Sequence, residues 1–257
     1  MMISKDTPSY LSLDNGKKLA YRFRKGSNEG RQQPPTLVFL GGYRSDMTGT
    51  KAVFLDELSS QKGYNLLRFD YSGHGASTGD FQDGCITEWT NDALTIIKTL
   101  VDGDMILIGS SMGGWISLII SRMLQNRVKG FIGVAAAPDF TDWVWNTEMT
   151  PAQQNLCKEQ GYIETPDGDL LTLRLFEDGV QNFILKSPLY LGFPSILLHG
   201  KKDSVVPYQI AQKLAAHIAP EPPELILIED GDHRLSRDED LAQLAVSTCS
   251  LYSRLQR

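Results

Sequence analysis

The hydrophobic positions of this chain fall into short runs that predict strands, separated by amphipathic stretches that predict helices. Near the start, alternating residues at 10–13 and 19–23 flank Asp14-Asn15-Gly16-Lys17, a turn sequence typical of a β-hairpin. Beyond residue 35 the runs become almost entirely apolar, which is typical of parallel strands buried on both faces. These runs lie at 37–40, 66–69, 105–108, 131–135, 195–198 and 225–228.

Helix-length amphipathic segments separate most of these apolar runs. They lie at 50–60, 88–100, 112–125, 207–218 and 239–255. The alternation of strands and helices predicts an α/β fold with a mostly parallel sheet and helices on both faces. The hairpin at the start predicts an antiparallel edge on this sheet.

The alternation stops after the sixth predicted strand, at 139–193. This segment has aromatic helical pieces, a hairpin sequence at 166–169 and a short helix predicted at 178–186. It is too long for an ordinary loop, which indicates a small cap insertion. We therefore predict a core formed by 1–138 and 194–257 and a cap formed by 139–193.

Composition and charge exclude several classes of protein. The 257 residues are 41% hydrophobic and 22% charged, which is ordinary for a globular chain and argues against disorder. The net charge is −6 and no basic run exceeds two residues, so we expect no nucleic-acid partner. The apolar runs are far shorter than the roughly 20 residues of a membrane span. Nothing in the sequence indicates the oligomeric state.

The cysteines and the first residues bear on the cellular compartment. Cys85, Cys157 and Cys249 are too widely spaced for a zinc site, and their odd number does not fit a disulfide framework. The first residues carry no apolar stretch of the kind found in secretory signals. We therefore expect a reducing cytoplasm and no metal ion.

The most informative motif is the pentapeptide Gly109-Ser110-Ser111-Met112-Gly113, which matches G-x-S-x-G. It follows an apolar run and opens a helical segment, the setting of a nucleophile elbow, and this makes Ser111 the candidate nucleophile. The alternative is an ordinary glycine-rich turn between strand and helix, a type of turn that also binds phosphate.

A serine nucleophile needs a base, and the chain has four histidines. His233 follows the last predicted strand in a loop from which a side chain can reach across the sheet edge, so we predict that it is the base. His74 precedes the nucleophile, His217 falls within an amphipathic helix, and His199 ends an apolar run and is expected to support the following loop. The alternative for His233 is a surface turn.

The acid that orients the base is predicted after the penultimate strand, where Asp203 stands. The order Ser111, Asp203, His233 is the order that α/β-hydrolases use. Asp139, after the preceding strand, is the second choice. Asp232 is interpreted as a turn former.

Acyl transfer also needs backbone N–H groups that stabilise the oxyanion. The amide of Met112, directly after the nucleophile, is the first candidate. The amide of Tyr43, in the loop that begins with Gly41-Gly42, is the second. The alternative for Gly41-Gly42 is that these glycines only turn the chain, although a turn and an oxyanion donor are compatible.

Several longer strings carry a resemblance to a known family. They are Gly42-Tyr43, Met47-Thr48-Gly49-Thr50-Lys51-Ala52, Arg68-Phe69-Asp70-Tyr71-Ser72-Gly73, Gly109-Ser110-Ser111-Met112-Gly113-Gly114-Trp115, Leu198-His199-Gly200-Lys201-Lys202-Asp203 with Val206-Pro207, and Asp232-His233-Arg234. The chain resembles the α/β-hydrolase superfamily over essentially its whole length. More narrowly, it resembles the family of the mitochondrial palmitoyl-protein thioesterase, also known as an acyl-glucuronide esterase.

This resemblance implies an α/β-hydrolase fold and a serine hydrolase that acts on thioesters or activated esters without a cofactor. It implies the same triad, Ser111, Asp203 and His233. The substrate would be a small molecule or an acylated protein. The organellar leader of the eukaryotic members is not evident here, so the chain looks like a bacterial relative.

Five side chains are candidates for the substrate pocket. They are Trp115, Phe140, Trp143, Trp145 and Arg44. The aromatic residues are placed to line an apolar acyl pocket, or alternatively to pack the cap against the core. Arg44, beside the oxyanion loop, is placed to meet an anionic group of the leaving part, or alternatively to lie solvated on the surface.

Two other functions remain open. A serine aminopeptidase or amide hydrolase would use the same triad, and a cap acid such as Glu148 or Glu159 would hold the substrate amine. A non-catalytic binding protein with this fold is disfavoured because it does not require all three triad residues. A serine at position 111 also disfavours an aspartate-nucleophile dehalogenase or epoxide hydrolase.

Overall fold

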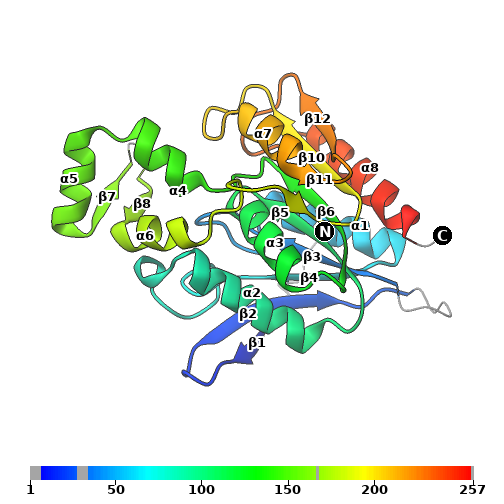
Figure 1. Cartoon of the computed structure of the whole chain (residues 1–257). Helices are drawn as coiled ribbons and strands as arrows, with labels where there is room; N and C mark the ends of the chain where they lie inside the picture. The colour runs from blue at the N-terminus through cyan, green and yellow to red at the C-terminus, as the bar shows by residue number, and fades with distance from the viewer. Residues whose placement is uncertain (1–6, 28–33, 166–167, 256–257) are drawn as a thin grey trace.

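The computed structural model describes residues 7–27, 34–165 and 168–255. In this part of the chain an eight-stranded sheet forms the centre of the molecule, with the strand order β1-β2-β4-β3-β5-β6-β10-β12 (Figure 1). Its strands are β1 (Ser9–Ser12), β2 (Lys18–Arg24), β3 (Thr36–Leu40), β4 (Asn65–Phe69), β5 (Met105–Ser110), β6 (Val128–Val134), β10 (Ser195–Gly200) and β12 (Glu224–Ile228).

Most of the sheet is parallel. β1 pairs antiparallel with β2, and β2 pairs antiparallel with β4. From β4 through β3, β5, β6 and β10 to β12, every pairing is parallel. The predicted mostly parallel sheet with an antiparallel hairpin at its edge is therefore confirmed.

Helices cover both faces of the sheet, and the strands supply apolar side chains to each face in turn. In β5, Ile106 and Ile108 pack with α1 (Thr50–Lys62) and α8 (Asp238–Arg254). The alternate residues Met105 and Leu107 belong to the opposite core. That core includes buried residues of α2 (Ile86–Leu100), α3 (Met112–Met123) and α7 (Gln209–His217). This alternation explains why the strand runs are apolar throughout.

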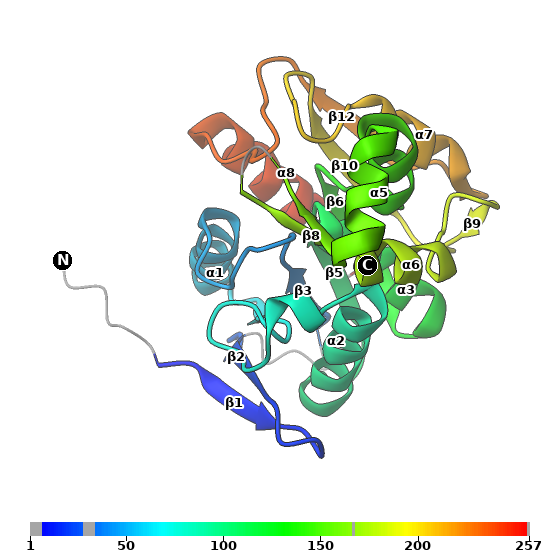
Figure 2. The ribbon, with the colours of Figure 1, turned by 90° about the vertical axis from the view of Figure 1, so that its left-hand side faces the viewer.

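The insertion after β6 has secondary structure of its own. Its elements are α4 (Phe140–Trp143), the π-helical turn η2 (Val144–Glu148), α5 (Pro151–Gln160), β7 (Tyr162–Glu164), β8 (Leu170–Thr172), α6 (Leu173–Gln181) and β9 (Leu189–Tyr190). Most of them lie to the left of the sheet in Figure 1, and Figure 2 shows α5 and β8 in front of the central strands. The exact division into a core and a cap at 139–193 stays a prediction.

The predicted elements of the insertion are partly correct. β7 and β8 pair antiparallel, as the hairpin sequence at 166–169 indicates, although residues 166 and 167 lie outside the described ranges. The helix predicted at 178–186 instead spans Leu173–Gln181. It begins earlier because the Thr172 side chain caps its first turn by accepting a hydrogen bond from the Leu175 amide.

Two short elements outside the insertion complete the described chain. The 3₁₀ helix η1 (Phe81–Asp83) precedes α2, and β11 (Ile218–Ala219) pairs with β9. Among the described helices, none combines the length and the apolar character that crossing a membrane requires. The three cysteines are free thiols.

Candidate active site

The candidate catalytic residues lie in loops that follow the carboxyl ends of four parallel strands. Tyr43 follows β3, Ser111 follows β5, Asp203 follows β10 and His233 follows β12. Because these strands run in the same direction, their carboxyl ends meet at one edge of the sheet, where α/β proteins bind ligands. Residues that are far apart in the sequence are thereby brought close together.

Ser111 occupies a strained turn between β5 and α3. Its backbone angles are φ 52° and ψ −120°, a conformation that is costly for a residue with a side chain. The turn is possible because the flanking glycines lack side chains. A Cβ on Gly113 would lie 2.1 Å from the carbonyl oxygen of Leu40, and one on Gly109 would lie 2.4 Å from that of Gly113. This geometry matches the nucleophile elbow that the sequence predicts.

Backbone hydrogen bonds hold the strained serine in place. The Ser111 amide donates to the Val134 carbonyl at 2.9 Å. The Ser111 carbonyl accepts from the amides of Gly114 at 2.9 Å and Ala137 at 3.1 Å. The serine backbone is therefore tied to the end of β6 and to the first turn of α3.

His233 and Asp203 form a hydrogen-bonded pair. The Nδ1–H of His233 donates to Oδ2 of Asp203 at 2.8 Å, and the carboxylate is fully buried. The other carboxylate oxygen, Oδ1, accepts from the amides of Val205 at 2.9 Å and Val206 at 2.7 Å. Since a carboxylate only accepts, His233 carries its proton on Nδ1 and its Nε2 is left as a base.

His199 also contacts Asp203, as its predicted role of supporting the following loop requires. Its Nε2 lies 3.2 Å from Oδ2 of Asp203 and 2.9 Å from the carbonyl oxygen of Val206. Burial by itself raises the pKa of the Asp203 carboxyl. Hydrogen bonds from His199 and His233 outweigh burial and hold that pKa well below its usual range. Asp203 is therefore a carboxylate at neutral pH.

A pocket of about 370 Å³ contains both Ser111 and His233. Tyr43 and Gly42, from the loop after β3, line the same pocket. A Cβ on Gly42 would lie 3.2 Å from the Cβ of Ser111, so this loop passes directly beside the candidate nucleophile. The predicted oxyanion loop, nucleophile and base therefore meet at one cavity.

Comparison with known proteins agrees with this arrangement. A family model described as serine aminopeptidase, S33, matches residues 32–162, about half of the chain. The human mitochondrial palmitoyl-protein thioesterase ABHD10 is 32% identical, over 98% of this chain and 82% of its own length. The chain is an α/β-hydrolase of the family that includes ABHD10. The family and the enzyme class that the sequence indicates are thereby confirmed.

Solved structures place the hydrolase in the same group. A putative hydrolase from Agrobacterium vitis S4 is 36% identical with a TM-score of 0.90, and the match covers 95% of this chain and 98% of that one. The mouse α/β-hydrolase domain-containing protein 10 is 30% identical with a TM-score of 0.89, covering 97% and 99%. The predicted α/β-hydrolase fold is confirmed.

The pocket of this hydrolase also has polar walls formed by residues outside the predicted triad. They come from the loop between β3 and α1, from the start of α1 and from the loop after His233, namely Ser45, Asp46, Thr50, Lys51, Arg234 and Ser236. The Lys51 ammonium donates to the carbonyl oxygen of Arg234, and burial lowers the pKa of Lys51 to about 8. Lys51 and Arg234 belong to the sequence strings that carry the family resemblance, and this is the sequence feature that could have identified them as site residues.

The aromatic substrate candidates lie elsewhere in the hydrolase. Trp115 is fully buried, with its ring edge-on to Phe140 at 5.6 Å and its Nε1–H bonded to the Asn182 carbonyl at 3.1 Å. Trp143 and Trp145 are half-buried against the same apolar core. None of these four aromatic residues lines the pocket that contains Ser111. They pack the insertion against the core, and a role in acyl binding stays a prediction.

Arg44 is turned toward the insertion. Its Nη1 donates to the Gly168 carbonyl at 2.6 Å and lies 3.3 Å from the Asp169 carboxylate. Its guanidinium also lies over the Phe81 ring at 5.7 Å. Arg44 lines a second pocket and is absent from the residues that line the Ser111 pocket. Its predicted contact with an anionic leaving group stays untested.

The alternative acid, Asp139, has a structural role in the insertion. Its two carboxylate oxygens each accept at 2.9 Å, one from the Ile184 amide and the other from the Leu185 amide. These bonds fasten the end of the insertion to its beginning. Asp232 accepts from the Leu235 amide at 2.9 Å, as expected of a turn former.

Proposed function

We propose that this hydrolase cleaves carboxylic thioester or ester bonds, in a small molecule or an acylated protein, through an acyl-enzyme on Ser111. The observation that carries the proposal is the 2.8 Å hydrogen bond from His233 to buried Asp203 beside the pocket that contains Ser111. Similarity to palmitoyl-protein thioesterases over nearly the whole chain supports the thioester as the bond class.

The first half of the cycle acylates the serine. Nε2 of His233 takes the hydroxyl proton while Oγ of Ser111 attacks the acyl carbonyl carbon. Asp203 keeps the imidazole in the required tautomer and stabilises the imidazolium that forms. The tetrahedral intermediate collapses, His233 returns the proton to the leaving sulfur or oxygen, and the thiol or alcohol departs.

Backbone amides of Tyr43 and Met112 stabilise the oxyanion of this intermediate. Tyr43 lines the pocket, and Met112 directly follows Ser111 at the start of α3. A donor of this kind contributes about 3 kcal/mol to transition-state stabilisation in serine hydrolases. The positive end of the α3 dipole adds to the effect at Ser111.

The second half releases the acid. His233 takes a proton from a water molecule that attacks the acyl carbon, and the second tetrahedral intermediate expels Oγ of Ser111. His233 then returns the proton to the serine. Apart from the substrate and water, each step uses only groups of this chain, so the proposal involves neither a metal ion nor a cofactor.

The test is a matched substrate panel on the wild type and Ser111→Ala. The panel contains p-nitrophenyl esters of short and long acyl chains, a palmitoyl thioester and aminoacyl anilides. We expect serine-dependent turnover of the thioester or the esters. Absence of turnover of these substrates, together with no labelling of Ser111 by a fluorophosphonate, would overturn the proposal.

A second candidate function is supported by the description of the matching family model, which names a serine aminopeptidase. The same triad would then cleave an amide, and an acid of the insertion would hold the substrate amine. Glu148, at the end of η2, is one such acid, and burial raises its pKa. Turnover of aminoacyl anilides without turnover of esters would favour this candidate.

A further inference from the structure

His74 lies outside the triad, yet it is buried beside the oxyanion loop. His74 belongs to the segment that follows β4, and only 3% of its surface is exposed. The rings of Tyr71, Phe81 and Trp89 pack against the imidazole, with centroid distances of 5.5, 5.0 and 5.2 Å. An imidazole held on three sides has little freedom to rotate, so its two nitrogens have fixed partners.

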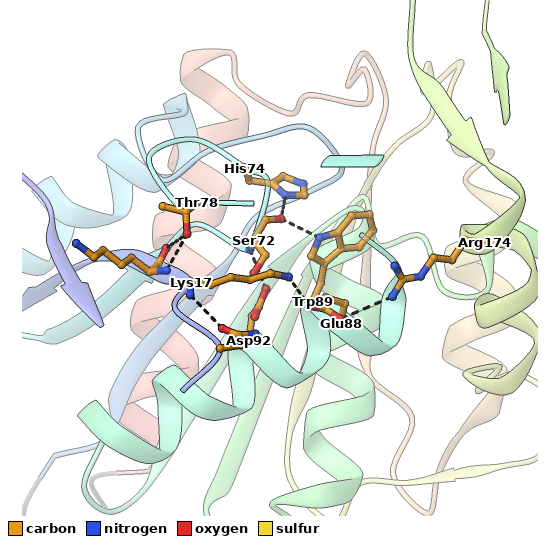
Figure 3. Close-up of polar contacts among 10 residues, drawn as sticks. Lys17, Ser72, His74, Thr78, Glu88, Trp89, Asp92 and Arg174 are labelled. Carbon is orange, nitrogen blue, oxygen red and sulfur yellow. Dashed lines mark hydrogen bonds and ion pairs between the residues drawn. The ribbon is translucent and has the colours of Figure 1, made fainter. Parts of the chain in front are cut away.

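The first partner is the carbonyl oxygen of Ser72, 3.2 Å from Nδ1 of His74 (Figure 3). Figure 3 also shows the indole Nε1–H of Trp89 on the same oxygen, at 3.2 Å. The Ser72 amide donates to Asp92 at 2.8 Å. Because a carbonyl can only accept, Nδ1 of His74 carries a hydrogen and Nε2 is an acceptor.

The second partner is the backbone of the oxyanion loop. The Arg44 amide donates to Nε2 of His74 at 3.3 Å. Arg44 has a φ of 54°, in the left-handed region that is unfavourable for a residue with a side chain. A partly buried hydrogen bond therefore stabilises a strained residue directly after Tyr43, whose amide is the candidate oxyanion donor.

We propose that His74 is a positioning residue: by accepting from the Arg44 amide, it holds the backbone of the preceding Tyr43 so that the Tyr43 N–H has the orientation that oxyanion binding requires. The inference rests on the proposed function, because the oxyanion is that of acyl transfer. The neutral imidazole is the active form, since a second proton on Nε2 would face the Arg44 N–H. Burial lowers the pKa of His74 and so favours the neutral form.

Two substitutions separate positioning from packing. His74→Leu removes the acceptor, whereas the Oε1 of the glutamine in His74→Gln can take the place of Nε2 and accept from the Arg44 amide. We expect His74→Leu to lower kcat by about 10- to 100-fold with KM within threefold, because a misplaced donor affects the transition state most. We expect His74→Gln to retain at least a third of the wild-type kcat, although its Tm should be similar to that of His74→Leu.

Leu94→Ala is the control for destabilisation, because Leu94 is a buried residue of α2 in the same apolar core. It should lower Tm while leaving kcat within twofold at a temperature where every variant is folded. A His74→Leu variant with wild-type kcat would overturn the inference. So would a His74→Gln variant as impaired as His74→Leu.

A second measurement does not depend on turnover. Long-range proton–nitrogen NMR of the wild type identifies the tautomer of each histidine, and His74→Gln assigns the signal. We expect a protonated Nδ1 and an unprotonated Nε2 at neutral pH. A hydrogen on Nε2 would overturn the inference, whereas failure of the proposed function would appear as wild-type protein without Ser111-dependent turnover.

Discussion

At the scale of single residues, the proposed mechanism depends on the buried carboxylate of Asp203. This side chain accepts from His233, from His199 and from two backbone amides, so its charge and orientation are both fixed. A carboxylate with these partners can hold His233 as an Nδ1–H tautomer.

Asp203→Asn should lower kcat by about 10³- to 10⁴-fold with a small change in KM. The amide can donate to Nδ1 of His233, which favours the wrong tautomer and leaves no stabilised imidazolium. Steady-state kinetics on the best ester substrate give the value. Asp232→Asn, in the neighbouring turn, is the matched control and should keep wild-type kcat. Equal activity of Asp203→Asn and wild type would exclude Asp203 as the acid.

Asp203 should also make the folded state sensitive to acid. Its pKa is lower in the folded protein than the ordinary value of 3.8 for an aspartate, so its ionised form stabilises the fold above that value. This stabilisation is lost as the pH falls below 3.8 toward the folded pKa. Urea denaturation of the wild type and Asp203→Asn from pH 6 to pH 3 should therefore show a difference in unfolding free energy that narrows only below about pH 4. A difference independent of pH would contradict this.

At the scale of elements, the strand–turn–helix unit around Ser111 is the most constrained part of the site. Gly113→Ala should destabilise the protein by about 3 kcal/mol or more, because its Cβ would meet the backbone of β3 2.1 Å away. Met123→Ala, exposed on the same helix, is the control and should change stability little. Denaturant unfolding measures both, and equal stability of the two variants would contradict the elbow geometry.

The hairpin β7–β8 contacts the oxyanion loop from the side of the insertion. The Tyr43 hydroxyl donates to the Leu170 carbonyl, while its ring packs on Phe81, Trp89 and Phe140. Tyr43→Phe keeps the ring and the backbone amide and removes only this bond. We expect a loss of about 1 kcal/mol in unfolding free energy, measured by denaturant unfolding. A loss below 0.3 kcal/mol would indicate that the hairpin is not held by this contact.

At the scale of the whole molecule, the sequence predicted those features that depend on local pattern. The apolar runs predicted the parallel strands, and Gly109 to Gly113 predicted a turn whose tightness the fold explains. The family resemblance agreed with both. The order of the triad along the chain then placed Ser111, Asp203 and His233 at one edge of the sheet.

Features that depend on contacts between distant segments could not be predicted in this way. The start of α6 depends on a cap by Thr172, and the insertion is fastened to α2 by Asp178, which accepts from the Thr87 amide at 2.8 Å. From the sequence, His74 is distinguished only by preceding the nucleophile, whereas packing places its Nε2 on the Arg44 amide. The aromatic residues of the insertion show the same limit, since hydrophobicity does not distinguish packing from substrate binding.

Mass spectrometry of the enzyme, quenched during turnover of a p-nitrophenyl ester, tests directly whether Ser111 carries the acyl group. We expect one acyl group on the peptide that contains Ser111, with no adduct and no turnover in Ser111→Ala. An acyl group on another residue, or turnover that persists in Ser111→Ala, would contradict the acyl-enzyme mechanism proposed for this hydrolase.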